Sequence, residues 1–261
     1  MPPAFHAAPR ISRRFWPVFM RNWLVFKKLA VPSVIGNIAE PLITLVAFGY
    51  GLGALIGQID GRPYVTYLAS GSIVVSAALA ATFEALYSAY SRMAVQKTWD
   101  SILNAPVTLD DIVFAEMIWA SFKALLSVAA ILVVVYVLDI SRAPTMLLAL
   151  PVLGFVGITF ASIALVFNAL AKGYDFFTYY FTLVVTPMTF LSGVYFPVEQ
   201  MPGWLQRVAQ VLPLTAAVEL VRPLILGEWP EHVLRPALIL IAYAAGGYYL
   251  ALVLTRRRFF K

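Results

Sequence analysis

Residues 190–222 decide the fold, and they read FLSGVYFPVEQMPGWLQRVAQVLPLTAAVELVR. This segment lies between apolar segments, but its glycines and prolines interrupt any helix that would cross a membrane straight through. Between the prolines, residues 204–212 form one short amphipathic piece, with apolar and polar side chains on opposite faces. Non-helical backbone is tolerated at membrane depth only where protein or a water-filled cavity covers it. The pattern therefore predicts a re-entrant element that enters the bilayer, turns and leaves again, covered by the rest of the chain.

The composition indicates a multi-pass membrane protein. Of 261 residues, 61% are hydrophobic and only 12% are charged, which a soluble domain of this length seldom needs. There is no cysteine, and the two histidines, His6 and His232, are far apart in sequence, so we expect no disulfide and no cysteine or histidine metal site. No phosphate-binding loop or hydrolase motif occurs. We predict no catalytic residue, no metal and no cofactor bound by this chain.

Six apolar segments each approach the roughly 20 residues that a bilayer core requires. They cover residues 31–56, 64–90, 111–138, 145–170, 176–191 and 236–254. Most of the 19 lysines and arginines lie in segments that this order places inside the cell, including the clusters at both ends of the chain. The net charge of +6 thus follows from membrane topology and does not indicate nucleic acid as a partner. We predict an all-α integral membrane protein with six transmembrane helices and both termini in the cytoplasm.

The N-terminal region divides into two parts before the transmembrane domain, which covers residues 29–261. Residues 1–10 contain three prolines and little periodicity, which predicts a disordered tail. Residues 11–28 have one aromatic and one basic face, which predicts an amphipathic elbow helix in the membrane interface, with its aromatic side chains in lipid. The aromatic face consists of Phe15, Phe19, Trp23 and Phe26, and the basic face of Arg14, Arg21 and Lys28.

Polar residues within the predicted spans mark surfaces that face protein or a cavity. Glu40 lies in the first span, and Glu84 continues a stripe of small and polar side chains along the second. Acids at this depth are costly and usually functional, so Glu84 is either a buried structural acid with a partner or a lining residue. Glu116 and Lys123 share a face of the third span, where we expect Lys123 to extend to the inner interface. Gly49, Gly53 and Gly57 favour helix packing over a dimer contact.

A polar stretch from residue 91 to residue 111 is predicted to lie inside the cell. Residues 96–104 form a short helix that ends before Pro106, because the residue before a proline is disfavoured in helical conformation. The apolar face of this helix consists of Trp99, Ile102 and Leu103. Thr108 then caps the next helix, with Asp111 three residues later completing a capping box. We interpret Asp110 and Asp111 as helix-start residues, not as a catalytic pair.

Several motifs carry a resemblance to a known family. The runs SGVYFP (192–197), MP (201–202), LPL (212–214) and RP (222–223) resemble the signature of the membrane subunits of ABC-2-type exporters. Further runs resemble, more narrowly, the nodulation-factor exporter permeases of the NodJ type. These runs are GNIAEP (36–41), IDG (59–61), ATFE (81–84), TWD (98–100), GYD (173–175) and TPM (186–188).

This resemblance implies a function and a set of site residues. It implies the permease subunit of an ATP-driven exporter in the bacterial inner membrane, surrounded by membrane lipid. Two copies would pair with two copies of a cytosolic ABC ATPase, which holds ATP and magnesium, and the cargo would be a lipo-oligosaccharide. The implied ATPase-coupling helix contains Trp99, Asp100, Ile102 and Leu103. The implied re-entrant gate contains Gly193, Tyr195, Phe196, Pro197, Pro202 and Pro213.

Two alternatives remain open from the residues themselves. One is an exporter of another glycolipid, a polysaccharide or a hydrophobic drug. The other is an ATP-independent carrier that uses Glu40 and Glu84 as a proton relay. Tyrosines offer aromatic faces with hydroxyl groups for a cargo that is part sugar and part lipid, although tyrosines also occur in interfacial belts. The candidate tyrosines are Tyr50, Tyr179, Tyr180 and, in the re-entrant segment, Tyr195.

Overall fold

The computed structural model describes residues 5–28 and 30–260, except for the side chains of residues 31, 33–35, 37, 38 and 40 within helix α2. The α-helices are α1 (Phe15–Lys27), α2 (Ala30–Thr44), α3 (Gly53–Ile56), α4 (Tyr64–Phe83), α5 (Thr98–Leu103), α6 (Leu109–Val137), α7 (Met146–Leu170), α8 (Asp175–Tyr180), α9 (Thr186–Leu191), α10 (Gly203–Ala209), α11 (Pro213–Leu226) and α12 (Leu234–Phe259). Wider π-helical turns are η1 (Leu45–Tyr50), η2 (Glu84–Ser88), η3 (Ser91–Val95) and η4 (Phe181–Val185), and η5 (Val198–Gln200) is a 3-10 turn. A small hairpin pairs β1 (Gln58–Ile59) with β2 (Arg62–Pro63).

Four helices of the described chain are long and apolar enough to cross a membrane. They run over Tyr64–Val95, Leu109–Val137, Met146–Leu170 and Leu234–Phe259. Helices α10 and α11 pass the same test together but are bent by 82° at their junction, as in a broken span or a re-entrant loop. The all-α membrane fold is therefore confirmed. The predicted first and fifth spans are present as shorter consecutive helices, α2–η1–α3 and α8–η4–α9, so the count of six stays a prediction.

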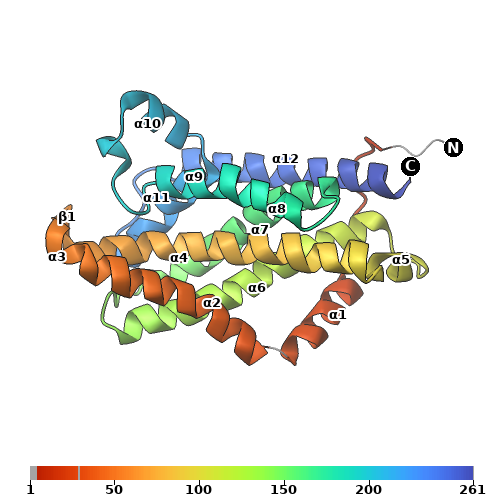
Figure 1. Ribbon diagram of the computed structural model, residues 1–261, viewed down its shortest axis with the longest axis horizontal. Helices are drawn as coiled ribbons and strands as arrows, with labels where there is room; N and C mark the ends of the chain where they lie inside the picture. The colour runs from red at the N-terminus through yellow and green to blue at the C-terminus, as the bar shows by residue number, and fades with distance from the viewer. Residues whose placement is uncertain (1–4, 29, 261) are drawn as a thin grey trace.

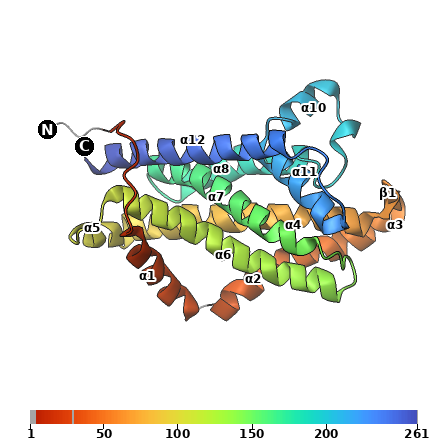
Figure 2. The same cartoon turned by 180° about the vertical axis from the view of Figure 1, so that it is seen from behind.

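Helix α7 lies at the centre of the bundle, where it contacts α4, α6, α11 and α12. The long helices run side by side along the long axis of the molecule (Figure 1), and the view from behind shows the same arrangement (Figure 2). Helix α5, the N-terminal segment from residue 5 onward and the end of α12 lie at one end of the bundle, and the hairpin and α10 lie at the other.

Local sequence signals account for several element boundaries. Thr108 Oγ1 accepts a hydrogen bond from the Asp111 amide at 3.2 Å, and the Thr108 amide donates to Asp111 Oδ2 at 3.1 Å, so the predicted capping box begins α6. Lys97 has a φ of 50°, and this left-handed residue turns the chain from η3 into α5. A Cβ on Gly49 would lie 2.8 Å from Val65 Cγ2, so Gly49 lets η1 approach α4 closely, as the helix-packing interpretation requires.

Residues 5–14 form a segment, here called the N-terminal strap, that crosses the end of α12. Disorder was predicted over residues 1–10, but residues 5–10 are seen in contact with the bundle. Arg256 Nη1 donates to the carbonyl oxygens of Phe5 at 3.2 Å and Ala7 at 2.7 Å. Local composition gives no indication of these contacts, because the strap's partners lie at the far end of the chain, and the predicted disorder of residues 1–10 stays a prediction.

The same strap contacts the start of α6. The Arg10 amide donates to Asp110 Oδ2 at 2.8 Å, and the Ser12 amide donates to Asp111 Oδ1 at 2.7 Å. Asp110 also accepts from the Arg256 guanidinium, with Nε at 2.9 Å from Oδ1. The two adjacent aspartates are thus helix-start residues, as predicted, and they also fix the strap and the end of α12.

Helix α1 turns its aromatic face onto α6, whereas the sequence analysis placed that face in lipid. Phe19 and Phe26 are each 8% exposed, and each ring centroid lies 5.6 Å from that of Trp119. The large exposed apolar residues of α1 are Trp16, Leu24 and Val25. Periodicity identified the aromatic face correctly, but it gives no information on whether lipid or protein covers that face.

The predicted re-entrant element corresponds to α10 and α11. Helix α10 projects from the end of the bundle (Figure 1), and the predicted apolar face of residues 204–212 is exposed, with Trp204 at 64% and Val211 at 58%. Helix α11 packs against α4, α7 and α12. It extends to Leu226, four residues beyond the predicted segment, and ends where Gly227 adopts a φ of 88°.

Candidate functional site

Four charged side chains form a buried group, here called the ionic cluster, between the long helix that begins as α4 and helix α6. Its members are Glu84, Arg92, Glu116 and Lys123. Arg92 Nη2 lies 2.9 Å from Glu84 Oε1, and Arg92 Nε lies 2.9 Å from Glu116 Oε1. Lys123 Nζ lies 2.7 Å from Glu84 Oε2. Glu84 is 4% exposed and Glu116 1%, so both carboxylates lie away from solvent beside the partly buried cations Arg92 and Lys123.

Neutral donors complete the hydrogen bonding of both carboxylates. Trp119 Nε1 donates to Glu84 Oε1 at 2.8 Å, and Trp99 Nε1 donates to Glu116 Oε1 at 3.2 Å. The side-chain amide of Asn22 donates to Glu116 Oε2 at 3.4 Å. The cluster therefore connects α1, the α4 helix, α5 and α6 through two acids.

Sequence reasoning identified part of this cluster. It left Glu84 as either a partnered structural acid or a lining residue, and Glu84 has both properties. It did not single out Arg92, although a spacing of eight residues places Arg92 about two turns from Glu84 on the same helix. Lys123 was expected to reach the interface but pairs with Glu84 instead, because a buried carboxylate is a better partner than distant solvent.

Beside the cluster, under α1, lies a cavity of about 500 Å³, here called the inner cavity. Most of its lining side chains are polar, charged or aromatic. They come from Arg21, Asn22, Val25, Phe26, Glu84, Tyr87, Ser88, Ser91, Arg92, Gln96, Trp119, Lys123 and Tyr174. The rings of Tyr87 and Tyr174 are stacked with centroids 6.0 Å apart. The volume lies within the roughly 300–1,000 Å³ that is usual for small-molecule sites.

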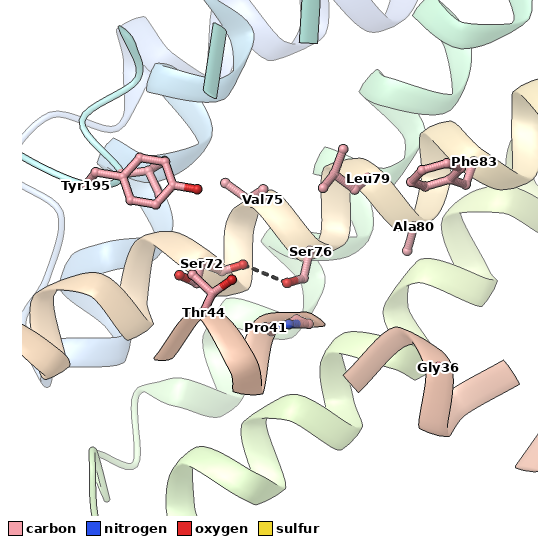
Figure 3. A pocket seen from close by; sticks show the side chains of 11 residues that line it. Gly36, Pro41, Thr44, Ser72, Val75, Ser76, Leu79, Ala80, Phe83 and Tyr195 are labelled. Carbon is pink, nitrogen blue, oxygen red and sulfur yellow. Dashed lines mark hydrogen bonds between the residues drawn. The ribbon is translucent and has the colours of Figure 1, made fainter. Parts of the chain in front are cut away.

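A second hollow of about 110 Å³, here called the outer pocket, lies between α2, α4 and the re-entrant turn (Figure 3). Pro41 and Thr44 face it from one side, and Ser72 and Ser76 face it from α4. The Ser76 hydroxyl donates to the Ser72 carbonyl oxygen at 2.7 Å. Tyr195 closes the third side, from the segment that the sequence predicted as a gate.

One face of the Tyr64–Val95 helix lines both hollows. Its lining residues recur every four positions: Ser72, Ser76, Ala80, Glu84, Ser88 and Arg92. Four-residue steps drift slowly around an α-helix of 3.6 residues per turn, and the wider π turns η2 and η3 offset that drift. At 1.5 Å per residue this lining face is about 30 Å long, which equals the thickness of a bilayer core.

A buried arginine holds the predicted gate turn against α4. Gly193 has a φ of 71°, and its carbonyl oxygen accepts from Tyr67 Oη at 2.8 Å and from Arg222 Nη2 at 2.7 Å. Arg222 Nε donates to Ser70 Oγ at 3.1 Å, and its guanidinium carbon lies 3.8 Å from the centroid of the Tyr67 ring. Sequence reasoning gave Arg222 no role beyond the family motif, since its partners come from two other segments.

The other predicted gate residues lie around this turn. Phe196 is 38% exposed, and Pro197 begins the short turn η5. Pro202 immediately precedes α10, and Pro213 is the first residue of α11. At these positions a missing backbone N–H removes no hydrogen bond of the helix. The prolines thus fix the bends of the re-entrant element, and of the six predicted gate residues only Tyr195 lines the outer pocket.

The predicted pathway tyrosines Tyr50, Tyr179 and Tyr180 do not line the inner cavity or the outer pocket, and their role in a pathway stays a prediction. Tyr50 is 61% exposed and Tyr179 is 64% exposed, and neither lines the inner cavity or the outer pocket. Tyr180 is buried, with its ring centroid 4.2 Å from that of Phe167. Tyr87 and Tyr174 line the inner cavity instead. The side chain of Glu40 lies outside the described residues, so its predicted position is not tested.

The predicted coupling residues of helix α5 differ in their exposure in this chain. Trp99 is 1% exposed, stacks with Phe259 at a centroid distance of 6.1 Å, and bonds to Glu116. Ile102 and Leu103 are half-buried against the core. The exposed residues of this region are Asp100, Ser101, Asn104, Ala105 and Pro106. Of the predicted coupling residues, Asp100 is the one whose side chain is freely accessible.

Comparisons with known proteins agree with this architecture. Residues 13–226 match the ABC-2 type transporter family. The chain is 44% identical to Nodulation protein J of Rhizobium meliloti (strain 1021), over 97% of this chain and 96% of that protein. It is 43% identical to Nodulation protein J of Rhizobium leguminosarum bv. viciae, over 92% of this chain and 93% of that protein. It is 22% identical to the inner membrane transport permease YadH of Escherichia coli (strain K12), over 75% of this chain and 73% of that protein. Taken together with the helical bundle and its re-entrant element, these matches show that the chain belongs to the ABC-2 type transporter family, as a membrane transport subunit.

Proposed function

We propose that this chain is the permease subunit of an ATP-driven exporter that moves an acylated oligosaccharide outward across the bacterial inner membrane. The observation that carries the proposal is the lining face of the Tyr64–Val95 helix, which joins the inner cavity to the outer pocket. A cargo that moves along this face would meet charged side chains and serine hydroxyls in the inner cavity and, among the described residues, serine hydroxyls without charged side chains in the outer pocket. The face is bordered by α2 on one side and by Tyr174 and Tyr195 on the other.

The chemistry of both hollows suits an amphiphilic cargo. Serine hydroxyls and tyrosine rings alternate with apolar side chains such as Val75 and Leu79. Tyrosine combines an apolar ring with a hydrogen-bonding hydroxyl, which fits a molecule that is part sugar and part lipid. The similarity to proteins named Nodulation protein J supports a lipo-oligosaccharide of the nodulation-factor kind as the cargo.

The energy source in this proposal is a separate ABC ATPase. The chain has no phosphate-binding loop, so a partner would hold ATP and magnesium. We place the partner against α5, at the end of the bundle that holds both chain termini, and assign that end to the cytoplasm because basic residues cluster at both termini. A second copy of this chain would close the open side of the lining face.

The ion pairing of Glu84 disfavours the alternative of a proton-coupled carrier. A relay acid must gain and lose a proton during transport. Glu84 lies within hydrogen-bonding distance of both Arg92 and Lys123, so both of its oxygen atoms are engaged in ion pairs and neither is open to a passing proton. We therefore assign Glu84 a structural and lining role.

The test of the proposed function is export itself. In a strain that makes acylated chitin oligosaccharides, the gene for this chain is deleted and then restored as wild type or as Ser76→Trp. The large indole fills the outer pocket, so we expect secretion to fall at least tenfold while the amount of subunit in the membrane is unchanged. Mass spectrometry of the medium and of the cells measures the secreted and retained glycolipids.

Ala245→Trp is the matched control, because Ala245 is exposed on α12 and lines neither hollow. It makes the same small-to-large change on the outside of the bundle and should leave secretion unchanged. Equal secretion from the deleted and the wild-type strains would exclude acylated chitin oligosaccharides as the cargo. Normal secretion by Ser76→Trp would exclude the lining face as the route.

A further inference from the structure

The inner cavity contains more positive than negative charge. Arg21, Arg92 and Lys123 line it, whereas Glu84 is the carboxylate that lines it. Glu116 lies behind the lining and also pairs with Arg92. Within the described residues, the ionic cluster and Arg21 together carry three positive and two negative charges.

Arg21 lines the same cavity but takes part in none of the ion pairs of the ionic cluster. Arg21 Nη1 donates a hydrogen bond to Asn22 Oδ1 at 3.1 Å, and among the described residues no carboxylate lies within salt-bridge distance of Arg21. Burial and the charge of nearby Arg92 lower the pKa of the Arg21 guanidinium, and the negative charge of Glu116 offsets only part of this effect. An anion placed in the cavity would relieve that repulsion and accept the hydrogen bonds that Arg21 has to offer.

The surroundings of Arg21 match a lipid headgroup better than a soluble anion. Val25 and Phe26 follow Arg21 along α1 and line the same cavity, and Val25 is 53% exposed. Leu24 beside them is 57% exposed. Apolar side chains next to a cationic cavity on an interfacial helix provide room for an acyl chain beside its headgroup.

Further donors line the cavity where the rest of a headgroup would lie. Ser88 and Ser91 supply hydroxyls from the α4 helix, and Gln96 supplies an amide whose Nε2 lies 3.1 Å from Ser91 Oγ. A phosphodiester with a hydroxylated headgroup would use both the cations and these neutral groups. A zwitterionic choline headgroup would add its own positive charge to a cavity that already has an excess.

We propose that the inner cavity binds the phosphate headgroup of an anionic phospholipid, of the phosphatidylglycerol kind, with Arg21 as the residue that contacts the phosphate. The lipid stands against α1 and its headgroup enters beside the ionic cluster. This site goes beyond the export function and does not depend on which cargo is exported.

The test measures lipid retained by the purified full-length chain in detergent, by native mass spectrometry, after addition of phosphatidylglycerol or phosphatidylcholine. We expect the wild type to retain phosphatidylglycerol in preference to phosphatidylcholine. Arg21→Gln should weaken retention of phosphatidylglycerol by about tenfold, as loss of a charged hydrogen bond implies. Arg13→Gln removes the same charge from an exposed position of the strap and should retain the lipid as the wild type does.

Two further arms separate the possible sources of the anion. Inorganic phosphate added to the wild-type complex should not displace phosphatidylglycerol, and displacement would show that the site takes a soluble anion. Arg21→Lys keeps the charge and should bind more tightly than Arg21→Gln. Equal retention of phosphatidylglycerol by wild type and Arg21→Gln, or equal retention of the two lipids by wild type, would overturn the proposal.

Discussion

Arg92 is the residue on which the buried charges of the bundle depend. Its guanidinium contacts Glu84 and Glu116, which come from different helices and are almost fully buried. Taking ions out of water is costly, and the cost is offset only while every charge keeps its partner. Without Arg92, Glu84 would keep Lys123 as its partner, and Glu116 would have no cationic partner.

Arg92→Gln should therefore lower the free energy of unfolding by about 3 to 5 kcal/mol, the usual cost of breaking a buried pair from one side. Arg142→Gln is the control, because Arg142 pairs with Asp139 at 2.8 Å but both side chains are at least 60% exposed. Such surface pairs contribute about 1 kcal/mol or less. Thermal unfolding of both variants in detergent measures the difference, and equal losses would contradict a buried role for Arg92.

Gly71 sets how closely the gate turn approaches α4. A Cβ at this position would lie 3.0 Å from the Cα and carbonyl oxygen of Val194 and 2.9 Å from Arg222 Nη2. Because backbone atoms cannot easily give way, Gly71→Ala should destabilise the fold by about 1 to 3 kcal/mol. Gly154→Ala is the control in another span, where the new methyl would lie 3.8 Å from Leu125 in ordinary contact. Thermal unfolding that responds equally to both changes would argue against the close approach.

At the residue scale, sequence reasoning succeeded where the signal was local. The capping box at Thr108 and Asp111 depends on two residues three positions apart, and it was predicted correctly. The partners of Arg222 and Arg256 lie in segments distant in sequence, and no local pattern specifies them. Trp99 shows what sequence reasoning cannot decide. An apolar helix face predicts that its side chains are buried, but not whether they pack against their own chain or against a partner protein.

At the scale of elements, α5 carries one residue that is buried in its own chain, Trp99, next to one that is exposed, Asp100. Trp99→Ala should lower the free energy of unfolding by about 3 to 5 kcal/mol, because it empties a buried site. Asp100→Arg reverses an exposed charge and should leave unfolding unchanged while lowering the ATP hydrolysis of the assembled complex at least threefold. Asp175→Arg, an exposed charge in the first turn of α8, is the control. Unchanged hydrolysis in Asp100→Arg would exclude α5 as the ATPase contact.

The bounds of the four long helices were predicted to within about five residues, and those of the short helix α5 to within two. A continuous apolar segment of 25 or more residues, such as Met146–Leu170, strongly predicts a transmembrane helix. The break between α10 and α11 was predicted from the prolines, but the sequence did not indicate that α11 packs inside the bundle. That packing depends on space between α4, α7 and α12, which exists only once the three helices pack.

At the scale of the whole molecule, the absence of cysteine from the chain makes its topology directly measurable. Single cysteines introduced as Gln58→Cys in the hairpin and Ser101→Cys in α5 lie at opposite ends of the bundle. A membrane-impermeant maleimide added to cells with a permeabilised outer membrane should label Q58C before lysis and S101C only after it. Labelling of S101C in unlysed cells would reverse the predicted orientation.

The N-terminal strap makes the first residues of the chain depend on the last. Ala7 accepts its hydrogen bond from a residue 249 positions later, and ribosomes add about 5 to 20 residues per second, so the strap waits roughly 12 to 50 s for its partner to be made. During that time its backbone groups are open to water and to proteases. A chain that stalls before α12 is complete therefore lacks Arg256, which holds this segment in the finished protein.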